Sequence, residues 1–280
     1  MDRQTLPADR QAIPADRQAL PVDRPTSSLD LKTLDVTESG ATLHVRMRRD
    51  GAKNVADEAL LDDLSEVLAH VRVRGDLRVL VLAGEETEFC LGGDRRELEA
   101  LAEADATGEA VLRVAEKARR VLDGLESADV ATIAAVRGPA VGAGVALALY
   151  CDLRVGTADC TFRMPELGLG LPTAWGGALS RLIAEVGAPR IREMALTCDV
   201  VDSARALEWS LLHRVAADSA ELDKIVDRWA RAIARRSHAA LRGTKALMRA
   251  YGTPARSGDL TELDGYLLAT ALGARQARGR

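Results

Sequence analysis

Two glycine-containing turns carry the backbone groups of this chain that could do chemistry. The first covers residues 89–94 (FCLGGD) and the second covers residues 137–144 (RGPAVGAG). Each turn follows an apolar run, at 79–83 or 131–136, that is typical of a buried strand. A strand that ends in glycines and enters a helix leaves backbone N–H groups unpaired and pointing outward. Two such turns that converge could hold a carbonyl oxygen that becomes negative during reaction, which is an oxyanion hole.

Glu166 is the candidate base. It follows Pro165 and precedes the apolar, glycine-containing run 168–172, so its surroundings are apolar. Desolvation raises the pKa of a carboxyl group toward a value useful for proton transfer. The α-proton of a thioester is acidic only if the enolate oxygen is stabilised, so two backbone donors and one base are the minimum requirement. The alternative is a surface glutamate in a loop, because charged residues are mostly exposed.

The composition excludes several classes of protein. The 280 residues are 47% hydrophobic and 29% charged, with a net charge of −4, which is typical of a globular protein with a large core. No sustained basic patch or zinc-ligand spacing occurs and aromatic residues are few, so we expect no nucleic-acid partner and no metal. The longest apolar stretch, 139–151, is too short and too glycine-rich to span a bilayer. With no secretory signal visible, we expect a cytoplasmic protein that does not contact membranes.

The four cysteines make no CxxC pair: Cys90, Cys151, Cys160 and Cys198. We expect buried, reduced thiols, as in a cytoplasmic protein. Cys90 lies beside the first glycine turn, so a reactive thiol is the alternative there.

The first residues form an internal repeat. Asp-Arg-Gln begins at Asp2, Asp9 and Asp16, and each seven-residue unit contains a proline. Proline in every unit excludes a coiled coil, and large apolar residues are few. The sequence therefore predicts a disordered extension over residues 1–28. A peptide that docks on a partner is the alternative.

From residue 29 the pattern predicts strands alternating with helices. Residues 31–38 and 41–48 favour a hairpin around Ser39-Gly40. Further strands are expected at 79–83, 131–136 and 153–155, and helices at 60–71, 110–125 and 144–150. This alternation predicts an α/β core with parallel strands. Beyond residue 174 we expect almost only helices, at 179–186, 188–198, 203–209, 222–236 and 239–251.

From about residue 29 to about residue 251 the chain resembles the crotonase, or enoyl-CoA hydratase/isomerase, superfamily. The strongest matches are residues 89–94, 135–152 and 162–182. The resemblance implies an α/β fold with a crotonase-like spiral of ββα units in a core at 29–200. It implies a helical C-terminal region at 201–280 that makes contacts in a homotrimer or hexamer. It also implies that the N–H groups of Gly93 and Ala143 form the oxyanion hole for a thioester carbonyl.

One departure from the family pattern bears on the reaction. Glu166 falls on the position of one of the two catalytic glutamates of the hydratases, but the position of the other is occupied by Ala146. A hydratase uses two carboxylates to hold and activate water, whereas the single-glutamate isomerases of the family keep the one that matches Glu166. We therefore expect double-bond isomerisation of an enoyl-CoA. The alternatives are an enoyl-CoA hydratase, an acyl-CoA decarboxylase, and a non-catalytic thioester-binding auxiliary subunit of a biosynthetic enzyme.

The resemblance also implies where the substrate binds. Coenzyme A is expected as part of the substrate, with no cofactor bound permanently. Its expected contacts, together with those of the thioester, are Ala52, Lys53, Leu91, Gly92, Asp94, Arg96 and Gly142. Trp175 is expected to line the acyl pocket, or else to be a core aromatic. Residues 274–280 are basic but lack the aromatic residues of many family tails, so an acyl-carrier-protein thioester is the alternative substrate.

Overall fold

The computed structural model describes residues 24–25, 29–49, 53–252 and 264–279. Most of the predicted N-terminal extension, and Ala52, therefore lie outside the described residues. Within these ranges no helix has both the length and the apolar character needed to cross a membrane.

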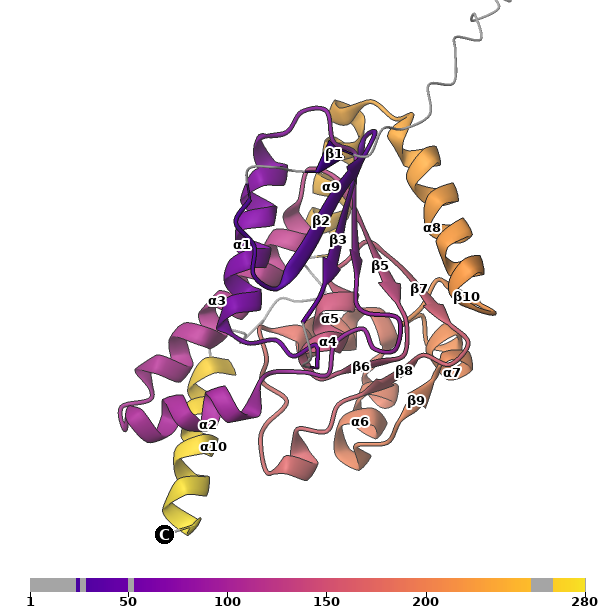
Figure 1. Cartoon of the computed structure of the whole chain (residues 1–280). Helices are drawn as coiled ribbons and strands as arrows, with labels where there is room; N and C mark the ends of the chain where they lie inside the picture. Colours follow the sequence, from indigo (N-terminus) through magenta and orange to yellow (C-terminus); the bar gives the residue numbers. More distant parts are fainter. Residues whose placement is uncertain (1–23, 26–28, 50–52, 253–263, 280) are drawn as a thin grey trace, which may run out of the picture.

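A seven-stranded sheet forms the centre of the molecule (Figure 1). Its strands, in spatial order, are β1 (Arg24–Pro25), β2 (Leu34–Ser39), β3 (Thr42–Met47), β4 (Val79–Ala83), β5 (Ala131–Val136), β7 (Leu153–Thr157) and β10 (Arg214–Ala216). The pairs β1–β2 and β2–β3 are antiparallel, and every pair from β3 to β10 is parallel. A second sheet contains β6 (Pro139–Val141), β8 (Thr161–Arg163) and β9 (Val201–Asp202). The predicted parallel α/β core is confirmed.

Ten helices and one 3₁₀ turn surround the sheets in the described residues. They are α1 (Glu58–Val73), α2 (Arg95–Ala104), α3 (Glu109–Ser127), α4 (Ala143–Leu149), α5 (Ala178–Val186), α6 (Ala188–Thr197), α7 (Ser203–Glu208), α8 (Ser219–Ala234), α9 (His238–Gly252), α10 (Asp264–Gly279) and the 3₁₀ turn η1 (Leu167–Leu169). Every predicted helix is present, with ends shifted by at most three residues. The sequence did not predict α2 or α10, and residues after 174 are not purely helical, because β9 and β10 lie among them.

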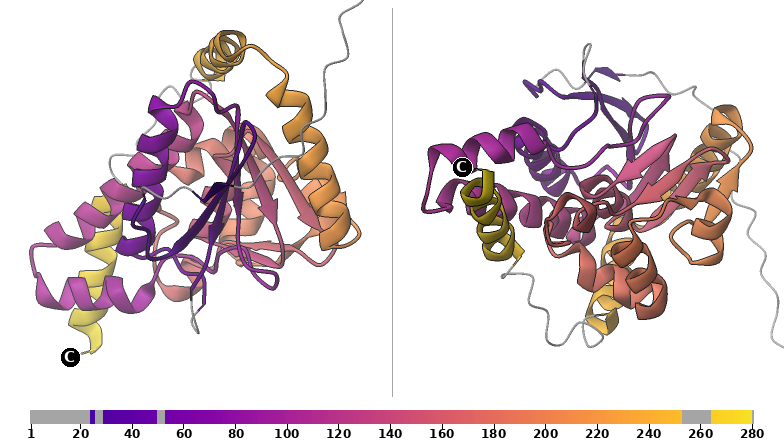
Figure 2. Two further views of the ribbon diagram at one scale, coloured as in Figure 1. Left: turned by 45° about the horizontal axis from the view of Figure 1, so that its top comes forward. Right: turned by 90° about the horizontal axis from the view of Figure 1, so that it is seen from below.

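The central strand β4 is apolar throughout, and β5 almost so, because helices cover both faces of the sheet. Leu80 and Leu82 of β4 belong to the large core that includes side chains of α1 and α3. Val79 and Val81, which point the opposite way, pack in a second cluster with side chains of α8. The two views of Figure 2 show α8 on the opposite side of the sheet from α1 and α3. Burial on both faces explains why these strands read as continuous rather than alternating apolar runs.

The C-terminal helix α10 folds back on the same chain, where it lies beside α2 and α3 (Figures 1 and 2). Leu268 and Leu272 are buried in this contact. The N–H of Gly177 donates to the Asp264 carboxylate at 2.9 Å, which ties the start of α10 to the loop before α5. The helix α10 therefore lies next to α2, which follows the first glycine turn.

Candidate active site

The two glycine turns lie side by side. They follow β4 and β5, which pair in parallel, so both turns leave the sheet at the same edge. The N–H of Val141 donates to the Cys90 carbonyl at 2.8 Å, and Cys90 and Ala140 form an isolated parallel bridge. The convergence that the sequence suggested is therefore present in the fold.

Glycine is required at the closest points of this contact. Gly92 has φ +102° and Gly142 has φ +50°, a region that side chains other than glycine rarely adopt. At Gly144 a Cβ atom would lie 2.2 Å from the Cys90 carbonyl oxygen, closer than atoms can approach. The glycines therefore allow the two backbones to touch.

Two backbone N–H groups face the space between the turns and the loop after β8. Gly93 lies in a bridge with Ala56, in which Ala56 N–H donates to Gly92 and Asp94 N–H donates to Ala56, so the N–H of Gly93 faces away from residue 56. Ala143 is the first residue of α4, where an N–H has no acceptor within its helix. Neither N–H donates to another group in the described part of the chain. Both residues line one pocket, as an oxyanion hole requires.

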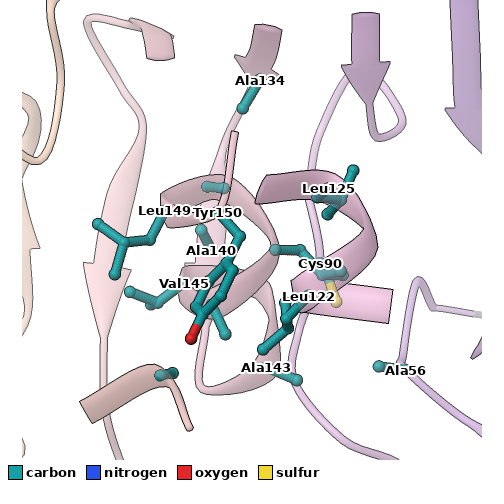
Figure 3. Packing of buried hydrophobic residues seen from close by; sticks show 14 of the residues in the cluster. Ala56, Cys90, Leu122, Leu125, Ala134, Ala140, Ala143, Val145, Leu149 and Tyr150 are labelled. Carbon is teal, nitrogen blue, oxygen red and sulfur yellow. The ribbon is translucent and has the colours of Figure 1, made fainter. Parts of the chain in front are cut away.

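The helix α4 is held firmly by its surroundings. All seven of its residues are buried. Figure 3 shows Val145 and Leu149 of this helix in the core, together with Cys90 and Leu122 from other elements. Ala146 is 1% exposed within this packing. Because the helix is enclosed on all sides by apolar groups, the orientation of the Ala143 N–H is fixed by the core.

Glu166 projects into the same pocket from the loop after β8. Its carbonyl accepts hydrogen bonds from the N–H groups of Leu169 (3.0 Å) and Leu171 (2.9 Å), which hold the turn. Its Oε2 is buried and has no hydrogen-bond partner among the described residues. Burial raises the pKa of this carboxyl group above its ordinary value of 4.5. Glu166 is therefore half-buried rather than fully exposed, and a carboxyl group with a raised pKa in a pocket is a candidate general base.

The pocket has a cavity volume of about 110 Å³ and is open to solvent. Seven predicted site residues line it: Leu91, Gly92, Gly93, Gly142, Ala143, Glu166 and Trp175. The Trp175 ring closes over the first turn, because a Cβ atom on Gly93 would lie 3.2 Å from its Nε1. Among the described residues that line the pocket, Glu166 is the only acid.

Three other predicted substrate contacts lie outside this pocket. Asp94 caps α2, since its carboxylate accepts hydrogen bonds from the N–H groups of Arg96 (2.8 Å) and Glu97 (3.2 Å). The side chains of Arg96 and Lys53 are exposed. Contacts of these residues with coenzyme A stay predictions, as does the contact of Ala52.

The pocket also contains residues that the sequence did not single out. Arg95, the first residue of α2, lines it in place of Arg96. Leu268 reaches it from α10, and no local signal in the sequence connects that helix with the glycine turns. The remaining additions are apolar or proline residues: Leu98, Val141, Pro165, Leu169, Leu171, Pro172 and Ala174.

The cysteines are free and buried, as predicted. Burial raises the pKa of Cys90 to about 11, which favours the protonated thiol at neutral pH and disfavours the reactive-thiol alternative. Across the described ranges, no group of three or more His, Cys, Asp or Glu side chains is arranged to hold a metal ion.

Comparison with known proteins agrees with this geometry. Residues 37–267 match the family model described as Enoyl-CoA hydratase/isomerase. The chain is 28% identical over 227 residues to the peroxisomal Delta(3,5)-Delta(2,4)-dienoyl-CoA isomerase of Arabidopsis thaliana, covering 78% of this chain and 81% of the relative. It is 29% identical over 224 residues to the probable enoyl-CoA hydratase echA6 of Mycobacterium tuberculosis, covering 77% and 82%.

Solved structures share the fold. An enoyl-CoA hydratase/isomerase from Mycobacterium paratuberculosis superposes with a TM-score of 0.80 at 23% identity, covering 89% of this chain and 98% of that one. Pseudomonas aeruginosa AtuE superposes with a TM-score of 0.75 at 30% identity, covering 89% and 91%. The chain therefore belongs to the enoyl-CoA hydratase/isomerase, or crotonase, family of acyl-CoA enzymes.

Proposed function

We propose that this enzyme moves the double bond of a 3-enoyl-CoA to the 2-position, with Glu166 as the proton shuttle. The observation that carries the proposal is the single acid of the pocket: Glu166 is half-buried, its Oε2 has no hydrogen-bond partner among the described residues, and burial raises its pKa. One carboxylate is sufficient to remove a proton at one carbon and return it at another.

The reaction follows from the positions of these groups. The thioester oxygen accepts hydrogen bonds from the N–H groups of Gly93 and Ala143. Glu166 removes a proton from C2, and the electron pair of the broken C–H bond delocalises onto the thioester oxygen to form a dienolate. The same carboxyl group then returns the proton at C4, so that the double bond lies between C2 and C3 and no atom is gained or lost. Each N–H donor is expected to lower the barrier by about 3–4 kcal/mol.

Hydration is the less favoured reaction because it needs a second group to position water. Ala146, at the position where hydratases of the family carry that group, has a methyl side chain within the apolar packing of α4. The relatives named above include an isomerase and a probable hydratase, and both reaction types depend on a stabilised enolate. The relatives therefore do not distinguish the two reactions. Isomerisation is favoured over hydration because Glu166 is the only acid among the described residues that line the pocket.

The test is turnover of a 3-enoyl-CoA and a 2-enoyl-CoA in deuterated water, followed by mass spectrometry. We expect the 3-enoyl substrate to isomerise with deuterium uptake and without added water. The Glu166→Gln variant should be slower by about 10³-fold. Glu97→Gln is the matched control, because burial also raises the pKa of Glu97 but this residue lies outside the pocket; it should retain activity.

Other results would point to other functions. Addition of water to the 2-enoyl substrate would show a hydratase, and loss of carbon dioxide from a malonyl thioester would show a decarboxylase. Absence of any proton exchange in the wild type would contradict the proposal and favour the auxiliary thioester-binding role. Repeating the assay with an acyl-carrier-protein thioester identifies the carrier.

A further inference from the structure

Arg95 is the only cationic side chain among the described residues that line the pocket. It begins α2, two positions after Gly93. Besides Arg95 and Glu166, the residues of the lining are glycines, prolines, Trp175 and residues with aliphatic side chains. Binding pockets commonly have mostly apolar walls and a few polar groups that orient the ligand. A guanidinium group in such a wall is therefore a candidate for recognising part of the substrate.

The guanidinium of Arg95 has no hydrogen-bond or ion-pair partner within the described chain. The nearby acids of α2 are engaged elsewhere. Glu99, one turn further along, forms an ion pair with Arg275 of α10 at 3.5 Å. Glu97 accepts the N–H of Glu58 at 3.1 Å. The positive charge of Arg95 is therefore available to a ligand.

The position of Arg95 is unfavourable for the helix itself. The N-terminal turn of a helix carries the positive end of the helix dipole, which favours acidic rather than basic side chains. Here Arg95 and Arg96 are the first two residues of α2. Local choices that disagree with the structure around them are expected at functional sites. Contact with coenzyme A phosphates outside the pocket would explain Arg96. Arg95 is also exposed but lines the pocket, so it needs another explanation.

We propose that Arg95 binds a carboxylate at the far end of the acyl group, so that the substrate is the monothioester of a dicarboxylic acid. The place of Arg95 in the pocket wall favours this role over phosphate binding. Lys53, Arg95 and Arg96 are all exposed, but of the three only Arg95 lines the pocket, where it shares the wall with Leu98 and Leu268. A guanidinium forms two parallel hydrogen bonds with a carboxylate, which gives both affinity and orientation. The inference depends on the proposed function only for placing the thioester oxygen at Gly93 and Ala143.

Binding of saturated thioesters tests the inference without requiring turnover. Isothermal titration would compare adipoyl-CoA, which ends in a carboxylate, with hexanoyl-CoA, which has the same chain length. We expect adipoyl-CoA to bind the wild type at least about 10-fold more tightly. The preference should be lost in Arg95→Gln, reduced in Arg95→Lys, and kept in the matched control Arg96→Gln. It should persist for the corresponding N-acetylcysteamine thioesters, which contain no phosphate.

Three outcomes would overturn the inference. The first is equal affinity of the wild type for both ligands, and the second is absence of binding by either. The third is a loss of affinity in Arg95→Gln that is the same for both CoA ligands and is not seen with the N-acetylcysteamine thioesters. The last would identify Arg95 as a phosphate contact. Thermal melts of each variant separate loss of binding from loss of folding. If the isomerase assay fails while the adipoyl preference holds, the reaction is wrong but the substrate class stands.

Discussion

The carboxylate of Glu166 lies directly against the α-carbon of Gly142. A Cβ atom on Gly142 would be 2.6 Å from the Oε1 of Glu166 and 3.9 Å from the α-carbon of Gly92. Glu166 and both glycine turns therefore lie close together around Gly142. The N–H of Gly142 also donates to the Arg163 carbonyl at 2.9 Å, so the strand that leads toward Glu166 is tied to this turn. The site has this geometry because residue 142 is a glycine and has no side chain.

Replacing Gly142 with alanine should therefore disturb the base. The added methyl group would displace the Glu166 carboxylate, and φ +50° is strained for alanine. We expect the rate of isomerisation to fall by about 10²-fold, measured as deuterium exchange. Gly170→Ala is the matched control, because Gly170 has φ +70° but nothing within 4 Å of the added atom. It should lower the melting temperature slightly and leave the rate nearly unchanged; equal loss in both variants would contradict the steric argument.

The pH dependence of the rate should report the environment of Glu166. The base acts in its ionised form, and burial raises its pKa above 4.5. We therefore expect kcat/KM to fall as the pH drops through an inflection above the ordinary range of glutamate. The inflection should be absent from the residual activity of Glu166→Gln. An inflection at or below 4.5 would show that the carboxyl group is solvated in the free enzyme.

The raised pKa of Glu166 also affects the stability of the folded protein. A carboxyl group with a raised folded-state pKa stabilises the fold only while it is protonated, and that contribution is lost as the pH rises through the folded pKa. Glu166→Gln should accordingly be more stable than the wild type at pH 8, and the difference should shrink toward pH 4. Denaturant unfolding of the wild type and the variant at pH 8 and pH 4 measures the difference in their free energies of unfolding.

Leu268 should limit the size of the acyl group. It is 5% exposed and reaches the pocket from α10. Leu268→Ala is expected to destabilise the packing of α10 by about 2–4 kcal/mol and to raise the preference for longer acyl chains by about 10-fold. Leu267→Ala is the control, because Leu267 is 53% exposed on the same helix. A chain-length series of kcat/KM and a thermal melt check both effects, and an unchanged length preference would remove Leu268 from the acyl site.

The ion pair between Lys245 and Asp152 should stabilise the fold. Lys245 is 6% exposed in its side chain, and its Nζ donates to Asp152 at 2.6 Å and to the Val130 carbonyl at 2.8 Å. Lys245→Met leaves the Asp152 carboxylate without its cation, so we expect a loss of about 3 kcal/mol in the free energy of unfolding. The exposed pair of Arg46 with Asp35 provides the control. Arg46→Gln should cost less than about 1 kcal/mol, and similar losses in both variants would contradict this ranking.

Much of the core could be predicted from the sequence because its signals are local. The strands β4 and β5 begin and end at the predicted residues, since burial on both faces leaves a run that is apolar apart from Thr132. The strands β6, β8, β9 and β10 have only two or three residues each, too few to show a period. They exist because other segments pair with them, so no local pattern predicts them.

The candidate site divides in the same way. The glycines at 92 and 142 and the acid at 166 are set by residue type, because only glycine tolerates those backbone angles and only a side chain that can ionise moves the proton. Which arginine enters the pocket was decided by the packing of α2, whose Leu98 and Ala102 are buried and fix the rotation of the helix. Both arginines are exposed, but only Arg95 lines the pocket, a distinction that the sequence does not reveal because the two residues are identical and adjacent.

The sequence by itself determined the two turns, the single acid and the family, because each depends on the chemical type of residues close together in the chain. Only the tertiary structure decided the burial of Glu166, the entry of Arg95 into the pocket and the wall contributed by Leu268. Desolvation of a carboxyl group depends on all the atoms around it, and the pocket that Glu166 lines is built from β6, α2, α4, α10 and the loop before α5. Segments that are distant in the sequence together determine the pKa of the base and the shape of the acyl site.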